Sequence, residues 1–325
     1  LRRCGSMEGV EMVEVGRLRC AHFTPRGPAR ALVVVASGSG GGIGPGVDEK
    51  LHPVPVSEIL RGEEEGASRK ARGALLVRAA RELALGVRCD ADGEPTEPPQ
   101  DEGGMASVLF EWGWGEVGSL NKDDYYRTPE CLRNCVAEIA EVAAWLRARH
   151  GSHLPLVLLG FSFGALASIT AAGAGACSPV AGVVALCSSA RGGPAFAAMG
   201  LETAAMMRAS GTNRLALLAC EGDAVVLPGV ARFLATRRGE GQRRAVLCVA
   251  EGGSHRLKEV LDEALAFALA QVRAAVAGEE SGGGRAPAPE LWATAAGVEP
   301  HRVHDAPPLR DAPAPEPNSP GYVVA

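Results

Sequence analysis

Apolar and polar positions along the chain alternate between two patterns, one typical of strands and one of helices. Short runs rich in Val, Leu and Ala have the length of buried strands, and longer stretches between them carry apolar residues at helical spacing. In the stretch 70–86, for example, Leu76, Ala79 and Leu83 fall on one helical face. Strands that alternate with helices predict an α/β fold with a doubly wound, mostly parallel sheet.

The strands of this sheet are expected at 31–36, 106–112, 154–159, 180–187, 215–220 and 244–250. The helices are expected at 70–86, 129–149, 165–172, in a segment that reaches about residue 237, and at 255–277. Residues 11–24 are expected to lead the sheet as an antiparallel strand or hairpin. The helix at 129–149 has a clear start, because Thr128 is a good N-cap and Pro129 suits the first helical position.

The elements predict one folded domain between two extensions. At 325 residues and 46% hydrophobic content, the chain can bury a sizeable core. We expect an N-terminal extension at 1–10, the folded domain at 11–277, and a disordered tail at 278–325, which is rich in Gly, Pro and Ala and lacks apolar periodicity. Two loops are long, 38–69 and 88–105, and the second, with several prolines and mixed charge, is expected to be mobile.

A G-F-S-F-G motif at 160–164 lies between a predicted strand and a predicted helix. This is the context of a nucleophile elbow, in which a tight turn lifts a serine, here Ser162, clear of the backbone. Small residues two before and two after the serine let the strand and the helix pass closely. In a chain rich in glycine the pattern also fits a chance turn, so the partners of the serine decide between the two interpretations.

A serine nucleophile needs a base, and the base needs an orienting carboxylate. Asp223 and His255 each follow a predicted strand directly, where ligand-facing residues collect in an open α/β sheet. Glu221, on the same loop as Asp223, is the alternative acid. The remaining histidines lie in an early strand, in a Pro-rich loop, at the opposite edge of the sheet or in the tail, and are weaker candidates: His22, His52, His150, His153, His301 and His304.

Three motifs in this order resemble those of the α/β-hydrolases: G-F-S-F-G at 160–164, G-D-A-V-V-L-P at 222–228 and G-G-S-H at 252–255. The chain is similar to the small, dienelactone-hydrolase-like members with little or no cap, over residues 10 to 277. The resemblance implies an α/β-hydrolase fold in which Ser162, Asp223 and His255 form a catalytic triad. Dienelactone hydrolases proper use a cysteine nucleophile, whereas this motif carries serine, so a lactone substrate is not implied.

The Gly-rich loop that begins at Ser37 is the expected oxyanion hole. The resemblance implies one backbone N–H from this loop and one from the residue after the nucleophile, which by position are Ser39 and Phe163. Gly38 and Gly40 belong to the same substrate-binding segment. Loss of one such donor costs about 3–4 kcal/mol in known cases. Members of this family usually have His-Gly where this chain has Ser-Gly.

Two nucleotide-binding interpretations fit less well. The loop after residue 36 is not a phosphate loop, because no Gly-Lys pair occurs in the chain. A G-x-G-x-x-G pattern at 113–118 follows a strand-like run, but no helix follows at once, so we interpret it as a Gly-rich turn. The net charge of −5 and the absence of a basic cluster argue against a nucleic-acid surface.

Nine cysteines without a C-x-x-C pair favour a reduced compartment, cytoplasmic or organellar. Those in predicted strands, Cys187, Cys220 and Cys248, are expected to behave as small buried hydrophobes. No apolar run approaches the ~18 residues of a membrane span, so none is expected.

The sequence therefore predicts a serine hydrolase that cleaves an ester or thioester of a small or medium acyl substrate through an acyl-serine. Its expected partners are this substrate and water, with no metal and no organic cofactor, and the sequence names no protein partner. The alternative is a non-catalytic interaction module that keeps the α/β-hydrolase fold. The Ser-Gly at the oxyanion loop and the long tail keep this alternative open, and labelling by a fluorophosphonate probe separates the two.

Overall fold

The computed structural model describes residues 9–38, 55–60, 71–98, 103–113, 128–188, 214–225 and 246–280. These residues contain an 8-stranded sheet with the order β1-β2-β4-β3-β5-β6-β7-β8. The strands are β1 (Val10–Val15), β2 (Leu18–Phe23), β3 (Leu32–Ala36), β4 (Ala106–Phe110), β5 (Leu156–Phe161), β6 (Gly182–Leu186), β7 (Arg214–Cys220) and β8 (Val246–Ala250). The pairs β1–β2 and β2–β4 are antiparallel, and all the other pairs are parallel.

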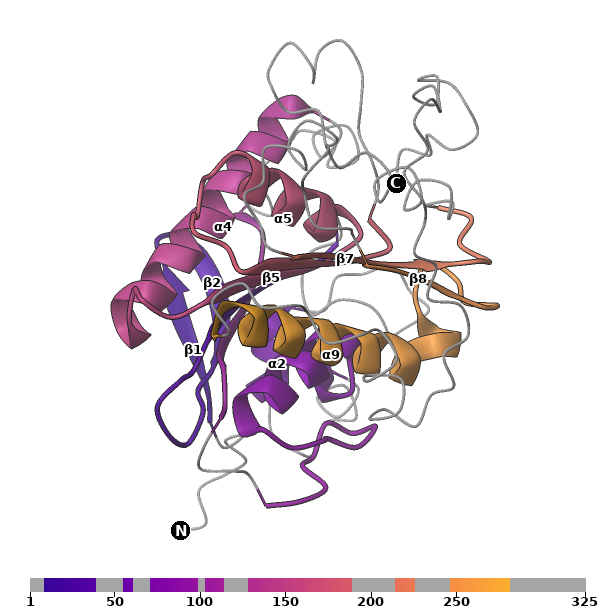
Figure 1. Cartoon of the computed structure of the whole chain (residues 1–325), viewed down its shortest axis with the longest axis horizontal. Helices are drawn as coiled ribbons and strands as arrows, with labels where there is room; N and C mark the ends of the chain where they lie inside the picture. The colour runs from indigo at the N-terminus through magenta and orange to yellow at the C-terminus, as the bar shows by residue number, and fades with distance from the viewer. Residues whose placement is uncertain are drawn as a thin grey trace.

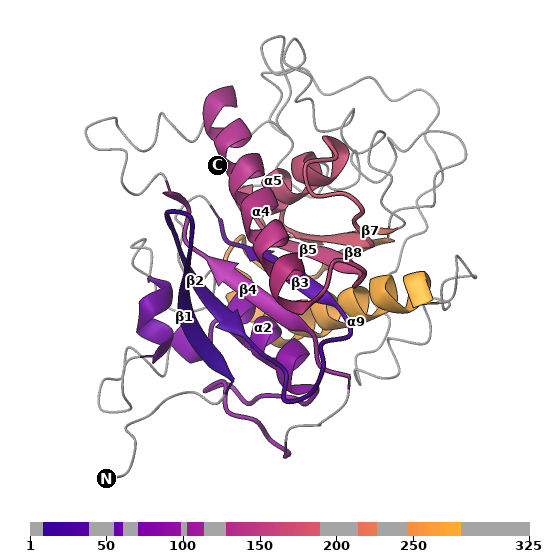
Figure 2. The same ribbon diagram turned by 90° about the vertical axis from the view of Figure 1, so that its left-hand side faces the viewer.

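Helices cover both faces of the sheet. The long helices α2 (Leu75–Leu85) and α9 (Leu261–Glu280) pack on one face, and α4 (Pro129–His150) and α5 (Phe163–Gly173) pack on the other (Figures 1 and 2). Two short 3₁₀ turns, η1 (Val56–Leu60) and η3 (Lys258–Val260), complete the described elements. The predicted doubly wound, mostly parallel α/β architecture is confirmed. The helix expected to reach about residue 237, the tail from 281 and most of the loop 38–69 lie outside the described residues.

Alternate residues of the central strands serve two separate cores. In β3, Val33 and Val35 join the cluster that contains α2 and α9, while Leu32 and Val34 join the cluster that contains α4 and α5. This follows from the period of two in a strand, whose successive side chains point to opposite faces. Both faces are buried, so the strands are uninterrupted apolar runs, which is why the sequence pattern located them.

The parallel register brings the carboxyl ends of four strands to one edge. Phe161 pairs with Leu186, Leu186 with Leu218, and Cys220 with Ala250. The segments that follow β5, β6, β7 and β8 therefore leave the sheet side by side, and each candidate site residue downstream of β5 lies on one of these segments.

The last predicted helix begins later than expected. We expected a helix over 255–277 with His255 at its start, but α9 begins at Leu261, and His255 lies in the turns before it. Leu257 has a φ of 58°, in the left-handed region, which a continuous α-helix does not contain. The prediction of a helix start at His255 was wrong, and the loop position leaves the imidazole clear of a helix face.

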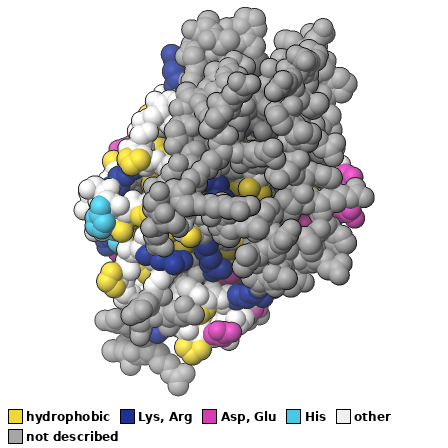
Figure 3. Space-filling model, in the orientation of Figure 1, with side chains coloured by type: hydrophobic (Ala, Val, Ile, Leu, Met, Phe, Trp, Pro, Cys, Tyr) yellow, Lys and Arg dark blue, Asp and Glu magenta, His cyan; other side chains and the backbone are white. Residues whose placement is uncertain are grey.

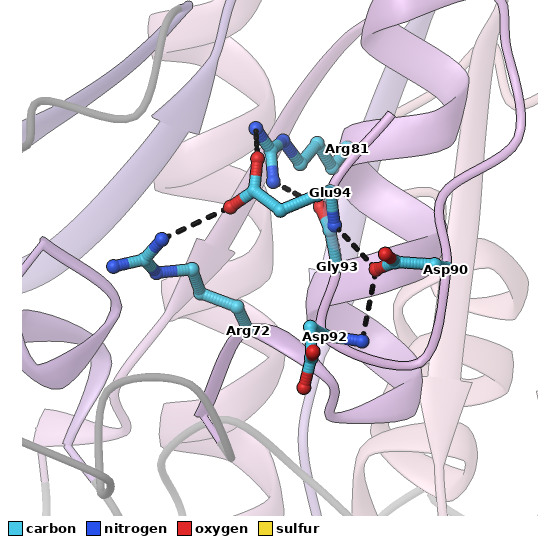
Figure 4. Close-up of polar contacts among 6 residues, drawn as sticks. All are labelled: Arg72, Arg81, Asp90, Asp92, Gly93 and Glu94. Carbon is cyan, nitrogen blue, oxygen red and sulfur yellow. Dashed lines mark hydrogen bonds and ion pairs between the residues drawn. The ribbon is translucent and has the colours of Figure 1, made fainter. Parts of the chain in front are cut away.

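The loop after α2 is tied to the helix along the part that the structure describes (Figure 4). The carboxylate of Glu94 accepts hydrogen bonds from Arg72 at 3.0 Å and Arg81 at 3.2 Å. Within the turn, Oδ1 of Asp90 accepts the backbone N–H groups of Asp92 and Glu94, both at 2.9 Å. On the face drawn in Figure 3, Lys and Arg side chains gather below the centre of the molecule, in the region where Figure 1 shows α2 and α9. This loop, which we expected to be mobile, is anchored by ion pairs over its first half.

Candidate active site

Ser162 lies on the sharp turn between β5 and α5. Its φ of 53° and ψ of −116° are a sparsely populated combination for a residue with a side chain. The residues at both ends of the motif must be glycine, because a Cβ atom would not fit at either position. A Cβ on Gly160 would lie 2.4 Å from the carbonyl oxygen of Gly164, and a Cβ on Gly164 would lie 2.3 Å from the carbonyl oxygens of Ala36 and Ser37. The G-x-S-x-G spacing thus reflects close passage of α5 against the ends of β5 and β3.

A chain of two hydrogen bonds joins Ser162, His255 and Asp223. The Oγ of Ser162 lies 3.0 Å from Nε2 of His255, and Nδ1 of His255 lies 2.8 Å from Oδ2 of Asp223. A carboxylate only accepts, so Nδ1 carries the hydrogen, and in a neutral ring Nε2 is then the acceptor for the serine hydroxyl. The structure therefore brings the three predicted residues together in an order that lets His255 take a proton from Ser162.

The carboxylate of Asp223 is held from its other side as well. Its Oδ1 accepts the backbone N–H of Val225 at 2.8 Å, and its own N–H donates to the carbonyl of Cys220 at 3.2 Å. The Asp223 side chain is fully buried, whereas the alternative acid, Glu221, is exposed. Of the two carboxylates on this loop, the geometry puts Asp223 against the imidazole.

The loop that carries His255 is stabilised locally. The N–H and the hydroxyl of Ser254 both bind one carboxylate oxygen of Glu259, at 3.1 and 2.7 Å. Gly253 packs so closely that a Cβ there would lie 2.8 Å from the sulfur of Cys220. The ring of Phe161 lies beside the imidazole, with 5.3 Å between ring centroids. The side chain of His255 stays 16% exposed, so it is the partly open member of the three.

The expected oxyanion loop is described up to Gly38. A Cβ on Gly38 would lie 3.4 Å from Cβ of Ser162, so this backbone passes directly beside the serine. Phe163 is the first residue of α5, where backbone N–H groups point toward the N-terminus of the helix. Ser39 and Gly40, which we also expected to bind here, lie outside the described residues. The position of Gly38 and Phe163 is consistent with a pair of donors around the serine.

Sequence reasoning missed the contribution of Trp112. Its indole N–H points to the backbone carbonyls of Ser37 and Gly38, at 3.1 and 3.2 Å. The ring packs edge-on against Phe110 and Phe163, with centroids 4.8 and 6.1 Å away. Trp112 thus fixes the backbone of the loop beside Ser162. Its place just after the strand that ends at Phe110, in the Gly-rich turn, was visible in the sequence, but its partners were not.

Two histidines that we judged weaker candidates meet away from the serine. His22 donates from Nδ1 to Glu11 at 2.8 Å, and its Nε2 lies 2.9 Å from Nε2 of His150. Trp145 packs edge-on against His22, and Arg149 pairs with Glu11. Burial lowers the pKa of His22, although Glu11 opposes the shift, and burial together with His22 lowers the pKa of His150. This cluster joins β1, β2 and the end of α4.

Cys187 lies close to Asp223 and His255. Among the described residues, these three side chains form a group that could hold a metal ion. Among the described residues, no helix is long and apolar enough to cross a membrane. The serine, imidazole and carboxylate by themselves suit nucleophilic attack on a carbonyl carbon, with the imidazole as base and then as acid.

No family model and no curated protein matches the sequence. Solved structures do resemble it. TT1662 from Thermus thermophilus is 20% identical with a TM-score of 0.51, over 79% of this chain and 95% of that one. A dienelactone hydrolase from Anabaena variabilis is 16% identical, with a TM-score of 0.50 over 81% and 95%. A putative alpha/beta hydrolase of unknown function from Agrobacterium tumefaciens, ATU1826, is 11% identical, with a TM-score of 0.51 over 86% and 100%. The chain has the α/β-hydrolase fold.

Proposed function

We propose that this protein is a serine hydrolase that cleaves an ester or thioester of a small or medium acyl substrate. The observation that carries the proposal is the hydrogen-bonded series from Ser162 through His255 to Asp223, with distances of 3.0 and 2.8 Å. Nothing in the packing of the fold requires a serine, an imidazole and a carboxylate to meet at one edge of the sheet. The likeness to solved structures gives the fold, and the activity is inferred from these side chains.

In the proposed reaction the oxygen of Ser162 attacks the carbonyl carbon while His255 takes the hydroxyl proton. Asp223 keeps the imidazole in the tautomer that can accept this proton and stabilises the imidazolium without becoming protonated. The tetrahedral oxyanion is bound by backbone N–H groups, one from Phe163 and one from the loop at Gly38 and Ser39. His255 then returns the proton to the leaving alkoxide or thiolate, and the acyl-serine is hydrolysed by water activated in the same way.

The test is covalent labelling with a fluorophosphonate probe, which reacts with an activated serine hydroxyl. Wild type should be labelled and Ser162→Ala should not. Ser168→Ala is the matched control, because Ser168 lies buried on α5 and its hydroxyl has no hydrogen-bond partner among the described residues. The control should label like wild type. A folded wild-type protein that takes no label would favour the non-catalytic interaction module instead.

Substrate class is tested with a panel of p-nitrophenyl esters and matching thioesters of increasing acyl length. We expect turnover for the short and medium acyl chains and its loss in Ser162→Ala. Turnover confined to long acyl chains, or to amides included in the same panel, would contradict the proposed substrate class. The panel also separates ester from thioester hydrolysis by the ratio of kcat/KM for the two series.

A further inference from the structure

The proposed acid and base belong to a group of sulfur, nitrogen and oxygen donors. One potential ligand atom from each of Cys187, Asp223 and His255 lies within 4.8 Å of the other two. Cys187 follows β6 directly, at the strand edge where Asp223 and His255 also emerge. The sulfur of Cys220 lies 4.0 Å from that of Cys187 and adds a fourth donor beside the group.

The backbone at Cys187 has a conformation that is unusual for a residue with a side chain. Its φ of 49° lies in the left-handed region, which residues with a side chain rarely adopt. Three described residues other than glycine have a positive φ, and the other two, Ser162 and Leu257, also belong to the site or its histidine loop. The strain at Cys187 is therefore part of how this edge of the sheet is built, and its sulfur lies within 4.8 Å of a carboxylate oxygen of Asp223.

We propose that Cys187, Asp223 and His255 bind a thiophilic divalent cation of the Zn²⁺ class, and that this cation switches the hydrolase off. Thiolate, imidazole and carboxylate are all Zn²⁺ ligands, whereas Mg²⁺ and Ca²⁺ prefer oxygen donors throughout. Tetrahedral bonds of about 2.0–2.3 Å put the donor atoms about 3.3–3.8 Å from one another. The present separations run from 2.8 Å between His255 and Asp223 up to the 4.8 Å limit of the group, and so bracket this range.

Binding removes one proton for each metal–sulfur bond that forms. Cys187 is buried, and its thiol donates a hydrogen bond to the sulfur of Cys220 at 4.0 Å. The cation replaces this proton, which leaves to solvent, while Asp223 binds as the carboxylate. The partly exposed ring of His255 is the outermost member of the group, so the cation approaches from its side.

Coordination and catalysis use the same atoms of His255, which is why we expect inhibition. If the cation takes Nδ1, the ring hydrogen moves to Nε2, and Nε2 can no longer accept the proton of Ser162. If the cation takes Nε2, the lone pair that accepts this proton is occupied. In both cases the proposed general base is lost. The inhibition rests on the proposed function, but the metal site itself does not.

Metal binding is tested directly with Co²⁺, whose coordination by a thiolate gives a charge-transfer absorption band in the near ultraviolet. Titration of the full chain should give this band in wild type and in Cys177→Ala, and Zn²⁺ should displace it. Cys177 is a matched control because it is also buried but precedes β6, at the opposite end of the strand from Cys187. In Cys187→Ala the Co²⁺ affinity should fall about tenfold or more, the expected effect of a lost ligand.

Inhibition is tested by ester hydrolysis with and without Zn²⁺. Wild type and Cys177→Ala should lose activity as Zn²⁺ is added and regain it with a chelator, while Cys187→Ala, compared with its own metal-free activity, should lose a much smaller fraction at the same Zn²⁺ concentrations. Cys187→Ser, checked for folding by circular dichroism, replaces the alanine variant if that one does not fold. Equal Co²⁺ bands in wild type and the Cys187 variant, or equal Zn²⁺ inhibition in both, overturns the inference. A band without any hydrolysis instead overturns the proposed function and leaves the metal site standing.

Discussion

At the residue scale, the carboxylate of Asp223 gives the sharpest test of the proposed mechanism. Asp223→Asn keeps the size of the side chain and the oxygen that accepts the N–H of Val225, but the amide also fits the wrong tautomer of His255. We expect kcat for p-nitrophenyl acetate to fall about 10,000-fold with little change in KM. Glu221→Gln, at the exposed acid two residues earlier, is the control and should stay within about twofold of wild type. An asparagine variant with most of the activity would contradict the role of Asp223.

Trp112 should position the oxyanion loop without touching the substrate. Trp112→Phe keeps an aromatic ring between Phe110 and Phe163 but removes the N–H that binds the carbonyls of Ser37 and Gly38. We expect kcat to fall about tenfold, equivalent to about 1.4 kcal/mol in the barrier, with KM nearly unchanged.

If Trp112 had only a structural role, Trp112→Phe would lower the stability of the protein and leave kcat unchanged. The midpoint of urea unfolding is therefore measured on the same samples. Trp145→Phe, which removes an indole that packs against His22, is the control for loss of a tryptophan. A fall in stability with kcat unchanged would argue against positioning by Trp112.

The sequence indicated Ser162, Asp223 and His255 as candidates because each lies just after a strand, in a local motif, and the structure brings the three side chains together. It did not indicate that Trp112 or Cys187 would lie beside them, because their places depend on contacts between segments distant in the chain. Trp112 meets a carbonyl 75 residues earlier, and Cys187 meets a sulfur 33 residues later. Local patterns predict where a side chain leaves the sheet, whereas such contacts follow from the register and twist of the whole sheet.

At the scale of elements, the packing of α5 against β3 depends on Gly164. Its Cβ in Gly164→Ala would lie 2.3 Å from the carbonyl oxygens of Ala36 and Ser37, which are backbone atoms and cannot move aside. We expect a loss of about 3 kcal/mol in unfolding free energy, measured by urea denaturation, or failure to accumulate as a folded protein.

The matched control for Gly164→Ala is Gly278→Ala in α9, where a Cβ would meet none of the described atoms within 4 Å. Because alanine is the better helix former by about 1 kcal/mol, this change should stabilise the protein slightly. Equal effects at the two glycines would show that the close passage of α5 and β3 does not limit residue 164.

Predicted elements agreed best with the structure where the pattern was strongest. Strands buried on both faces were found as continuous apolar runs, and α4 begins at Pro129 with Thr128 as its cap, as the sequence predicted. The prediction failed at His255, because the left-handed φ of Leu257 separates it from α9, and nothing in a leucine signals such a conformation. The periodicity of apolar residues predicts where a helix or strand lies, whereas its first and last residues depend on the backbone angles of single residues.

At the scale of the whole molecule, the pair of His22 and His150 links the antiparallel edge of the sheet to α4 and should make stability depend on pH. The hydrogen-bond chain from Glu11 through His22 to His150 is complete with both rings neutral, whereas protonation of both rings would put like charges 2.9 Å apart. Both folded pKa values are lowered from their usual value, chiefly by burial. Protons therefore bind the unfolded chain first as the pH falls below about 6.5, and stability is lost in that direction.

His22→Gln isolates this effect, because His22 is fully buried while His150 is only partly so. The unfolding free energy of wild type, measured in urea between pH 7.5 and 5, should fall faster than that of the variant, by at most about 1.4 kcal/mol per pH unit. The variant should be less stable than wild type at pH 7.5, since it loses the bonds to Glu11 and His150, so the slope rather than the absolute value carries the test. His153→Gln, at an exposed position in the turn after α4, should keep the wild-type slope. If the unfolding free energy of wild type and of His22→Gln fell with the same slope between pH 7.5 and 5, protonation of His22 would not be the cause of the loss of stability in acid.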